Sequence, residues 1–434
     1  MRCLVTGAYG FIGREVVTAL LREGVTVVGA GRDLDFGRHI FPGIDWIACD
    51  FNRDTDVAQW RERLGGIDAV VNCVGILQGT AKDNAERIHG DATIALFEAC
   101  AEAGVRRVVH VSAISAESDV TSGYARSKAK ADTALAALDL DWVIVKPSLV
   151  IGRGAYGGTA LMRGLAGLPY ILPLPGPATE RFQPIAADDL ARGIAKLATG
   201  ETAARRETVF AAGPETLSVG DILRRLRAWL GFAPAREVAV PLPLLRLLLR
   251  FGDAAGWIGH ASAARTTSLT QMLYDRIVDA EPFTRIAGPV KTFAETLQTA
   301  PATMQDRLHA RAYFAVPFLQ VALAMFWILS GLIALGPSTT LLAGTILAHA
   351  GVDPALAQPL VGLGAAVDVL AGVLFLVPGW VRRAGALQLA ISAVYLIGLS
   401  IVAPALWFDP FGALLKIVPL MGATLVVMAF QEKR

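Results

Sequence analysis

The sequence predicts an α/β domain built on a doubly wound parallel sheet, followed by an all-α transmembrane bundle of four helices. Two observations support this prediction. In residues 1–300, short apolar runs alternate with helical stretches and charged residues are spread throughout, whereas from about Tyr313 onward charged residues nearly vanish. A chain of 434 residues is also too long for one ordinary core. We therefore expect two domains, residues 1–305 and residues 306–434.

The strands of the first domain are predicted from its short apolar runs. These lie at residues 3–6, 25–30, 44–49, 69–73, 107–112 and 142–146, with helical stretches that include 11–22, 85–103 and 125–138. Strands that are apolar on both faces and alternate with helices are typical of a parallel sheet covered on both sides, the nucleotide-binding Rossmann arrangement. We expect a cofactor half at about 1–150 and a substrate or lid half at about 151–305.

Three glycines at three-residue intervals follow the first predicted strand and open the first predicted helix. In this arrangement Gly7 permits a tight turn, Gly10 lets backbone approach a pyrophosphate, and Gly13 lets the helix pack closely on the sheet. The helix N-terminus adds N–H donors and a partial positive charge. A glycine-rich turn alone is often only a turn, but this context predicts dinucleotide binding by Thr6, Gly7, Tyr9, Gly10, Phe11, Ile12 and Gly13.

The tip of the second predicted strand bears on the choice of nucleotide. Arg32 comes first there and Asp33 follows. An acidic residue at this position binds the ribose 2′-hydroxyl of NAD, whereas an arginine suits the 2′-phosphate of NADP. We favour NADP(H) over NAD(H), and the alternative is that Arg32 is a solvated loop residue. Further cofactor contacts are expected after later strands, from Asp50 at the adenine edge, Phe51, Cys73, Val74, Gly75 and Pro147.

Tyr124 and Lys128 stand four residues apart, so both lie on one face of a predicted helix. Ser112 ends the preceding strand. Together with the glycine turn, these residues lie in five segments whose order and spacing resemble the short-chain dehydrogenase/reductase superfamily, in its extended or atypical branch. The segments are TGAYGFIG (6–13), VSAIS (111–115), YARSK (124–128), KPSLVIGRG (146–154) and QPIAADDLA (183–191). Within that superfamily, residues 1–300 are most similar to the NAD(P)H-binding accessory subunit of respiratory complex I and its bacterial relatives.

The resemblance implies roles for three side chains. Tyr124 is the expected general acid that protonates a carbonyl oxygen. The ammonium of Lys128 is expected to lower the pKa of that phenol and to bind the nicotinamide ribose. Ser112 is expected to polarise the carbonyl, with Ser115 a weaker candidate. The alternative is a half-buried aromatic at a helix start and a solvated lysine.

Two features of the resemblance leave open whether the protein catalyses a reaction. The complex I relatives bind the nucleotide without an established turnover. In addition, Lys146 stands where extended members usually have arginine, which keeps the charge but loses the planar fork that binds anions.

The lid half offers two further candidate features. Residues 152–154 and 168–177 are predicted loops, and Asp188 and Asp189 either line the substrate cleft or cap a helix at 190–197. The stretch Pro241–Ile258 is rich in leucine, and its Arg246 and Arg250 stand at i and i+4 on one face. It predicts either an amphipathic helix that lies on a membrane or an ordinary lid helix.

Four long apolar stretches predict membrane spans at about residues 313–335, 359–377, 384–403 and 411–430, each near the ~20 residues that cross a bilayer core. The short apolar stretch 341–350 is expected to be re-entrant or interfacial. Arginines and lysines alternate onto one side of these spans, which predicts a multi-pass protein of the inner membrane with both termini cytoplasmic. The bundle resembles the DoxX-like membrane family, which is associated with quinone-linked redox chemistry. Asp368 and Lys416 either form an ion pair within it, or Lys416 snorkels to the interface while Asp368 hydrogen-bonds inside the bundle.

Composition excludes some functions. The net charge of +2 and the lack of a basic stripe exclude a nucleic-acid partner. Cys3, Cys49, Cys73 and Cys100 lie in apolar runs without metal-ligand spacing, so we expect reduced core cysteines and no metal site.

Two functions remain after these exclusions. One is a membrane-anchored NAD(P)H-dependent oxidoreductase that acts on a lipophilic carbonyl or a quinone. The other is a non-catalytic NADPH-binding accessory or assembly module that docks to a membrane redox complex.

Overall fold

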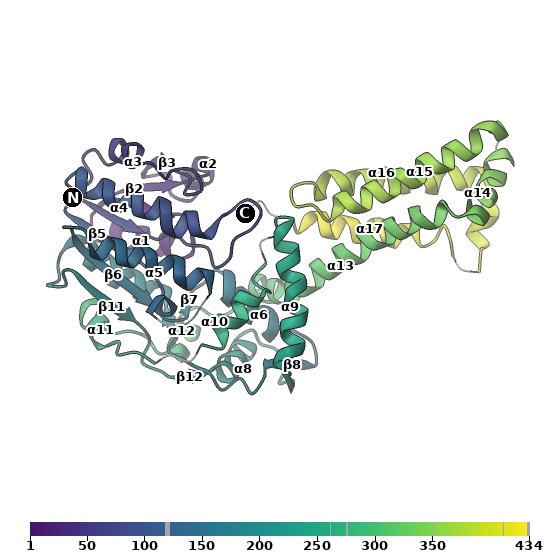
Figure 1. Cartoon of the computed structure of the whole chain (residues 1–434). Helices are drawn as coiled ribbons and strands as arrows, with labels where there is room; N and C mark the ends of the chain where they lie inside the picture. Colours follow the sequence, from purple (N-terminus) through teal and green to yellow (C-terminus); the bar gives the residue numbers. More distant parts are fainter. Residues whose placement is uncertain (118–121, 261, 275–276, 350, 411, 432–434) are drawn as a thin grey trace. The chain divides into compact units, whose positions relative to one another are not determined.

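The structure is a computed structural model that describes residues 1–117, 122–260, 262–274, 277–349, 351–410 and 412–431. It divides into two compact units, Met1–Ala310 and Arg311–Arg434. The boundary falls inside one long helix, α13 (Met304–Ala334), and Figure 1 traces the chain through both units.

A seven-stranded sheet, all of whose pairings are parallel, forms the centre of the first unit. The six strands predicted from apolar runs are all present, and a seventh, which was not predicted, joins at one edge. In spatial order the strands are β11 (Glu207–Ala211), β6 (Asp141–Pro147), β5 (Arg107–Val111), β4 (Ala69–Asn72), β1 (Arg2–Thr6), β2 (Thr26–Gly31) and β3 (Asp45–Ala48).

The strand order reverses direction at β1, because β2 and β3 extend the sheet to one side and β4, β5, β6 and β11 to the other. The last residue of β1, Thr6, is in register with Ala30 on one side and Asn72 on the other. Three strands thus end level with one another at this position. In open α/β sheets, ligands bind at such a switch point, beyond the carboxyl ends of the strands.

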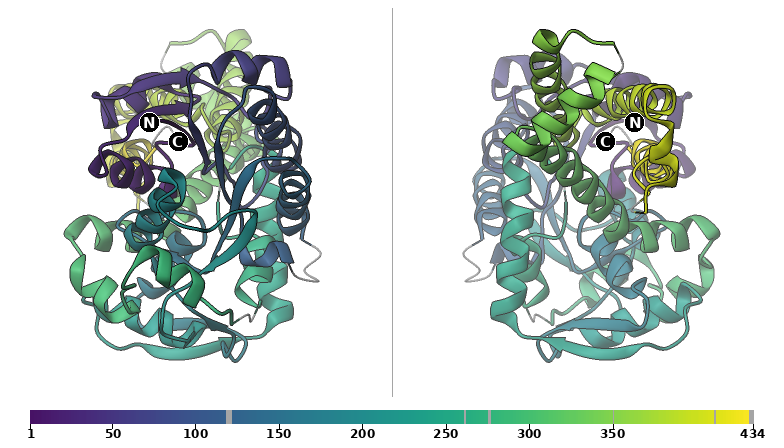
Figure 2. Two further views of the ribbon diagram at one scale, coloured as in Figure 1. Left: turned by 90° about the vertical axis from the view of Figure 1, so that its left-hand side faces the viewer. Right: turned by 90° about the vertical axis from the view of Figure 1, so that its right-hand side faces the viewer.

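Helices cover both faces of the sheet, and two separate hydrophobic clusters result. The first cluster lies under α1 (Phe11–Arg22), α7 (Ala187–Thr199) and α11 (Glu281–Ala287). The second lies under α3 (Val57–Arg63), α4 (Ala92–Glu102) and α5 (Gly123–Ala136). Figure 2 shows the sheet and its helices from two further directions. The smaller helix α2 (Leu34–Ile40) follows β2, and a π-helical turn, Arg87–Asp91, leads into α4.

The second half of this unit is built from shorter elements. Its helices are α6 (Gly157–Ala166), α8 (Val219–Trp229), α9 (Leu242–Trp257), α10 (Thr266–Met272) and α12 (Phe293–Thr299). Its strand pairs are β7 (Val150–Ile151) with β10 (Ile185–Ala186), β9 (Arg181–Phe182) with β12 (Leu217–Ser218), and β8 (Ile171–Pro175) with β13 (Arg236–Val240). The loop predicted for residues 168–177 is therefore wrong in its middle, because β8 finds a partner about 65 residues later in the sequence.

The prediction that Asp188 and Asp189 cap the helix is wrong. The residue that caps α7 is Ala186, and both aspartates lie in the first helical turn. The Nζ atom of Lys291 lies 3.0 Å from the Asp188 carboxylate and 2.8 Å from that of Asp189, which also accepts from the main-chain N–H of Lys291. Arg192 pairs with Asp189 as well. The two carboxylates thus fasten the segment before α12 to α7.

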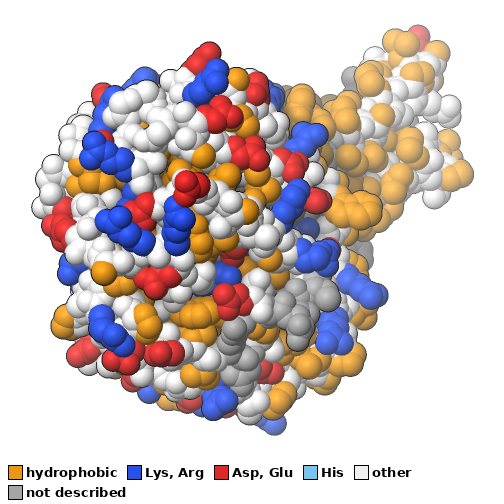
Figure 3. All heavy atoms as spheres, turned by 60° about the vertical axis from the view of Figure 1, so that its left-hand side comes forward, with side chains coloured by type: hydrophobic (Ala, Val, Ile, Leu, Met, Phe, Trp, Pro, Cys, Tyr) orange, Lys and Arg blue, Asp and Glu red, His pale blue; other side chains and the backbone are white. Residues whose placement is uncertain are grey.

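The second unit consists of apolar helices. Among the residues that the structure describes, three helices are long and apolar enough to cross a membrane: α13, α15 (Pro354–Phe375) and α16 (Val381–Val402). The helices α14 (Pro337–His349) and α17 (Ile417–Ala429) are apolar but shorter. Large side chains that face outward here are hydrophobic, such as Phe318 and Ile401, both 76% exposed. Figure 3 shows this contrast with the first unit, whose surface mixes charges of both signs.

The fourth predicted span, residues 411–430, differs from the structure. Residues 412–416 form a turn, so only 13 residues from Ile417 onward are helical. At 1.5 Å per residue, this helix is about 20 Å long, less than the ~30 Å of a bilayer core.

The predicted ion pair between Asp368 and Lys416 is wrong for the residues that the structure describes. Asp368 is buried between α15 and α16, where the hydroxyl of Tyr395 lies 3.4 Å from each carboxylate oxygen. Lys416 is exposed. The alternative, a carboxylate hydrogen-bonded within the bundle, describes Asp368.

Candidate nucleotide-binding and catalytic site

The glycine turn has the conformation that its sequence requires. Gly7 has a φ of +66°, which favours glycine, and its carbonyl oxygen accepts a hydrogen bond of 2.8 Å from the Gly10 N–H. A Cβ atom added at Gly13 would lie 2.0 Å from the Gly7 oxygen, and one at Gly10 would lie 3.0 Å from it. Helix α1 can therefore start this close to β1 only with glycine at position 13.

The N-terminus of α1 follows the carboxyl end of β1 and has no side-chain cap. Gly10 is the N-cap residue and has no side chain that could accept from the first helical N–H groups. Those donors and the positive end of the helix dipole fit a phosphate group. Next to them the ring of Phe11 stacks on Tyr156 at 5.3 Å, and Ile12 is half-buried.

Tyr9 reaches from the glycine turn to the tip of β2. Its hydroxyl oxygen accepts from the main-chain N–H groups of Arg32 at 2.8 Å and Asp33 at 3.0 Å, and its ring stacks on Trp46. Gly31 leaves room for this ring, because a Cβ there would lie 2.4 Å from it. Tyr9 thus joins the phosphate turn to the segment that is expected to contact the adenosine ribose.

Arg32 has a partner that the sequence did not reveal. Its Nη1 atom lies 2.6 Å from the carboxylate of Asp83, which also accepts from the Asn52 amide at 2.8 Å. Arg32 is thus paired, although its side chain is still 55% exposed, as the alternative of a solvated loop residue expects. Asp33 accepts from the Phe36 N–H and caps α2, so its carboxylate has a structural role here. Asp83 lies 51 residues after Arg32, which explains why spacing gave no signal.

The middle of the predicted cleft is built by β1, β4 and the loop after β4. The Thr6 hydroxyl donates to Asn72 Oδ1 at 2.7 Å, and the same oxygen accepts from the Val74 N–H at 3.2 Å. The half-buried Cys73 donates its main-chain N–H to the carbonyl of Thr6. These bonds hold Cys73, Val74 and Gly75 beside the glycine turn, where they were predicted to border the cofactor.

Asp50, Phe51 and Pro147 lie in different surroundings. Asp50 follows β3 and its carboxylate accepts from the Asn52 N–H, so it stays at the same edge as Arg32. Phe51 is 4% exposed and packs edge-on against Trp60 at 5.2 Å. Its side chain therefore belongs to the core beneath the sheet edge. Pro147 ends β6 and is half-buried.

Tyr124 and Lys128 occupy successive turns at the start of α5, whose N-cap Ser122 accepts from the Ala125 N–H. Lys128 is 3% exposed, and its Nζ atom donates to the carbonyl oxygens of Val111 at 2.9 Å and Val74 at 3.3 Å. The alternative of a solvated lysine is wrong. The ammonium lies instead between the ends of β4 and β5, next to Gly75.

The pKa values of this pair are shifted mainly by burial. Burial lowers the pKa of Lys128 to about 8, while Asp132 and Cys73 oppose the shift. Burial raises the pKa of Tyr124 to about 12, and the negative charge of Asp132 raises it further. The expectation of a lowered pKa for Tyr124 is therefore wrong, since desolvation of the phenolate raises the pKa and Asp132 adds to the rise.

The ring of His89, in the π-helical turn before α4, packs against the ring of Tyr124. It meets that ring edge-on at 5.4 Å. Its Nε2 accepts from the Ile76 N–H at 3.0 Å, so Nδ1 carries the proton and faces the hydroxyl of Ser127 at 2.9 Å. Burial and the charge of Lys128 lower the pKa of His89 well below its usual value, which keeps the ring neutral.

A buried polar cluster lies behind Ser112, and the sequence analysis missed it. The Ser112 hydroxyl donates to Asp132 Oδ2 at 2.8 Å, and Lys146 Nζ lies 2.9 Å from the same oxygen. Lys146 also bonds to Glu117, and His110 Nε2 lies 3.5 Å from the other oxygen of Asp132. Asp132 comes four residues after Lys128 and so lies on the same face of the helix. This spacing was the one feature of the sequence that could have pointed to Asp132.

The cysteines agree with the prediction of reduced core thiols. All four are free; Cys3, Cys49 and Cys100 are buried, and Cys73 is half-buried. Over the described ranges of the chain, no cluster of three His, Cys, Asp or Glu side chains is placed to hold a metal ion.

Comparisons with known proteins match both units. Residues 7–164 match an NAD(P)H-binding family, and residues 324–425 match a DoxX-like family. The mitochondrial NADH-ubiquinone oxidoreductase 40 kDa subunit of Neurospora crassa is 26% identical over 281 residues, which are 64% of this chain and 72% of that protein. The chloroplastic divinyl chlorophyllide a 8-vinyl-reductase of Oryza sativa subsp. indica is 30% identical over 279 residues, 60% of this chain and 64% of that protein.

Among solved structures, the Bordetella bronchiseptica enzyme WbmH in complex with NAD+ superposes with a TM-score of 0.52. The match covers 72% of this chain and 98% of that chain at 16% identity, which shows the fold. The chain thus carries an N-terminal NAD(P)H-binding domain with a Rossmann fold, which is related to complex I accessory subunits. A C-terminal DoxX-like membrane domain follows it.

Proposed function

We propose that this protein is a membrane-anchored oxidoreductase that uses NADPH to reduce a lipophilic carbonyl or quinone-type substrate. The observation that carries the proposal is the position of Tyr124 and Lys128. They lie on successive turns of α5, and the ammonium of Lys128 reaches the loop 73–75 that borders the glycine turn. One proton donor and one fixed cation beside a nucleotide site suit the reduction of a carbonyl or quinone oxygen.

The nucleotide is held by the residues at the switch point of the sheet. The N–H groups at the start of α1 bind its diphosphate, and Gly13 keeps the cradle open, since a Cβ there would collide with the Gly7 oxygen. Residues 73–75 border its centre. When bound, the reduced nicotinamide supplies a hydride.

Tyr124 donates a proton to the substrate oxygen as negative charge develops on it. Lys128 stabilises the phenolate that remains, since its positive charge lies one helical turn away and favours the charged form. Ser112 orients the same oxygen once its hydroxyl turns from Asp132. The neutral His89 ring holds Tyr124 in place from its edge.

Arg32 supports NADPH as the preferred nucleotide, because a guanidinium at the tip of β2 suits a 2′-phosphate. Its present partner, Asp83, is 23% exposed and can be replaced by the phosphate. An exposed pair of this kind contributes only about 0–1 kcal/mol.

In this proposal the membrane domain anchors the enzyme in the inner membrane, with the nucleotide domain on the cytoplasmic side. This orientation rests on the basic residues Arg307, Arg311, Arg382 and Arg383, which flank the long apolar helices. An anchor of this kind brings the active site to a substrate that stays in the lipid phase.

A non-catalytic accessory module is the second candidate, and a specific observation favours it. The polar groups of Ser112 and Lys128 both bond to protein atoms, and the pKa of Tyr124 is raised by burial and by Asp132. The Neurospora relative is itself a subunit of a membrane redox complex. In this case the protein holds NADPH and docks to such a complex.

The substitution Tyr124→Phe separates the two candidates. An oxidoreductase is expected to lose NADPH oxidation in the presence of a short-chain quinone or carbonyl by about 100-fold or more, with its Kd for NADPH within about twofold. The matched control is Tyr170→Phe, since Tyr170 is 88% exposed. No turnover by the wild type, at intact NADPH binding, would support the accessory module, whereas equal turnover by wild type and variant would remove the role of Tyr124 as proton donor.

A further inference from the structure

Helix α9 turns its apolar side chains toward solvent. Leu244, Leu247, Leu248, Phe251 and Ile258 are between 47% and 72% exposed. Their spacing of three, four and seven residues places them on one face, which we call the leucine face. A helix on the surface of a soluble domain faces solvent with polar residues. The leucine face is therefore unusual for a helix at the surface of a Rossmann domain.

The opposite face of α9 holds the helix against its own domain. A Cβ added at Gly252 would lie 2.0 Å from the Ala264 carbonyl oxygen, and one at Gly256 would lie 2.7 Å from the Arg265 guanidinium. Asp253 accepts from Arg265 at 3.2 Å and from the hydroxyl of Thr266 at 2.7 Å. These contacts fix the rotation of α9 about its axis, so the leucine face cannot turn inward without breaking them.

The edge of the leucine face carries the residue types of a membrane interface. Arg246 and Arg250 are exposed and lie side by side along one flank of the leucine face. Trp257, at the end of the helix on the same flank, is 82% exposed. Apolar residues bordered by arginines and a tryptophan characterise helices that lie in the plane of a bilayer surface, because the cations attract anionic headgroups.

We propose that α9 lies in the cytoplasmic interface of an anionic lipid bilayer, with the leucine face in the acyl region and Arg246 and Arg250 at the headgroups. The apolar helices of the same chain are the reason to propose a lipid bilayer as the partner of the leucine face. In the described part of the chain, three helices are long and apolar enough to span a membrane, and α13, the first of them, begins at Met304. The tether keeps the first unit within reach of the bilayer, so a weak individual contact becomes a stable one.

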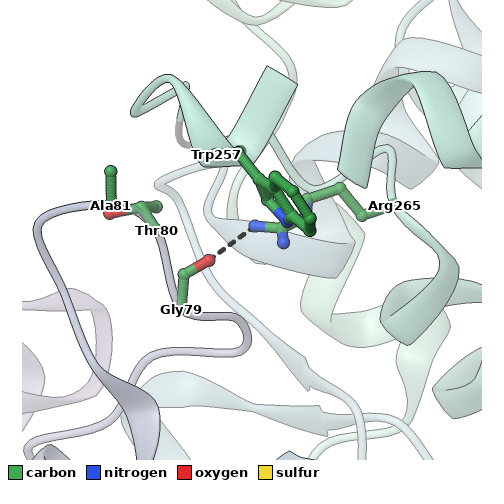
Figure 4. A pocket seen from close by; sticks show the side chains of 6 residues that line it. Gly79, Thr80, Ala81, Trp257 and Arg265 are labelled. Atoms are coloured by element: carbon green, nitrogen blue, oxygen red, sulfur yellow. Dashed lines mark hydrogen bonds between the residues drawn. The ribbon is translucent and has the colours of Figure 1, made fainter. Parts of the chain in front are cut away.

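The contacts on the inner side of α9 connect the leucine face, through α10 and the loop after β4, to helix α5, which carries Tyr124. A hollow of about 430 Å³ opens where the end of α9 meets the loop after β4 (Figure 4); it is lined by Gly79, Thr80, Ala81, Gly256, Trp257 and Arg265. Arg265 donates to the Gly79 carbonyl at 2.6 Å. On α10, Ser268 accepts from Gln78 at 2.8 Å, and Gln271 lies 3.4 Å from Ser122, the N-cap residue two positions before Tyr124.

This chain of contacts assigns α9 a second role, which rests on the proposed function. A lipophilic substrate leaves the bilayer beside Trp257, enters the hollow, and reaches Tyr124 when α10 and the loop after β4, which the bond between Gln78 and Ser268 joins, move apart. The leucine face therefore sets how well a membrane-dissolved substrate is used. It does not set the chemistry at Tyr124.

The first test measures membrane contact and is independent of catalysis. The full chain carrying Phe251→Cys is labelled with an environment-sensitive fluorophore and placed in nanodiscs that contain anionic lipid. Nitroxide groups on lipid acyl chains are expected to quench this probe by more than about twofold. The control is Leu21→Cys on α1, whose native side chain is 41% exposed in the same unit, and its probe should not be quenched. Absence of quenching at position 251, or equal quenching at both positions, would overturn the proposal in favour of a protein occupant.

The second test measures substrate access. Leu247→Asp with Phe251→Asp is expected to raise the KM for a long-chain quinone in the nanodisc by about tenfold, because charges in the acyl region are costly. The KM and kcat for a water-soluble analogue should stay unchanged. An equal change for both substrates would overturn the role of α9 in access. Quenching without turnover of either substrate would retain the membrane contact and reject the proposed oxidoreductase.

Discussion

The two ends of the nucleotide cleft are built differently. At the proposed phosphate end, backbone atoms make the site: Gly7, Gly10 and Gly13 close the turn, and no side chain caps the N-terminus of α1. At the reactive end, side chains make it, and those of Ser112 and Lys128 bond to groups of the protein itself. In the proposed site, the phosphate end therefore needs no exchange of side-chain hydrogen bonds, whereas the reactive end must exchange internal hydrogen bonds for contacts with substrate. Binding and turnover are expected to be separable by mutation.

The largest effect is expected from Gly13→Val. A side chain at this position collides with the Gly7 carbonyl oxygen, so α1 must move away from β1 and the phosphate cradle is lost. We expect NADPH affinity to fall by about 100-fold or more, together with a lower thermal unfolding midpoint of the first unit. Fluorescence titration of NADPH measures the affinity. The control is Gly24→Ala, a glycine with no atom within 4 Å of a new Cβ; its positive φ predicts some loss of stability but intact binding. Tight NADPH binding by the Gly13 variant would contradict a phosphate site built from backbone.

Asp132→Asn tests the side-chain end and is expected to have the next largest effect. Asp132 raises the pKa of both Tyr124 and Lys128, in addition to the effects of burial, so its neutralisation lowers both pKa values. The alkaline limb of the pH–turnover profile should move to lower pH. Loss of a buried ionic partner for Lys146 should also cost about 3 kcal/mol of stability.

Asp139→Asn is the matched control for Asp132, because Asp139 is 92% exposed. An unmoved alkaline limb in the Asp132 variant, at intact NADPH affinity, would mean that Asp132 has a structural role alone.

The burial of Lys128 is expected to make the free energy of unfolding depend on pH. The pKa of Lys128 in the folded protein is about 8, below its ordinary value of 10.5, so the unfolded chain binds more protons between these two pH values. The unfolding free energy should therefore rise with pH from about 8 to about 10.5 and lose this contribution as the pH falls below 8. The variant Lys128→Met should lack the rise. Unfolding midpoints of the full chain measured across this window check the sign, and an identical slope in wild type and variant would contradict the buried ammonium.

The smallest effect is expected from Asp83→Asn. The substitution releases Arg32 from its carboxylate partner and leaves the guanidinium for a 2′-phosphate. Affinity for NADPH should rise by about twofold to fivefold while affinity for NADH stays constant, since a partly exposed pair contributes about 0–1 kcal/mol. Asp35→Asn, a 99% exposed carboxylate on α2, is the control. A parallel change in both affinities would show that Arg32 does not select the nucleotide.

The difference between a phosphate end built from backbone and a reactive end built from side chains explains which parts of the site could be predicted from the sequence. The phosphate turn was visible because its geometry requires glycine at fixed positions, and Tyr124 and Lys128 were visible because helical spacing puts them on one face. The cluster around Asp132 brings together residues of β5, α5 and β6, and the pair of Arg32 and Asp83 crosses 51 residues. Contacts between distant segments leave no local pattern, so these partners emerged only from the fold.

In the membrane domain the sequence predicted apolar helices but not all their lengths. Hydropathy along residues 411–430 is continuous, yet a turn at 412–416 with Gly412 at a φ of +63° delays the start of α17. Likewise, the short strand β11 was missed because its five residues are bounded by charged residues on one side. Local hydrophobicity indicates burial or lipid contact, but it does not locate the turns that interrupt a helix.

The most direct test of the account is equilibrium binding of NADPH to the full chain in nanodiscs, measured by titration calorimetry beside NADH. The account predicts one NADPH per chain, bound more tightly than NADH, and a complex that forms equally well with the Tyr124→Phe protein. If neither nucleotide binds to the wild-type chain, the glycine turn is not a phosphate site, and every role assigned here to Tyr124, Lys128 and Ser112 fails with it.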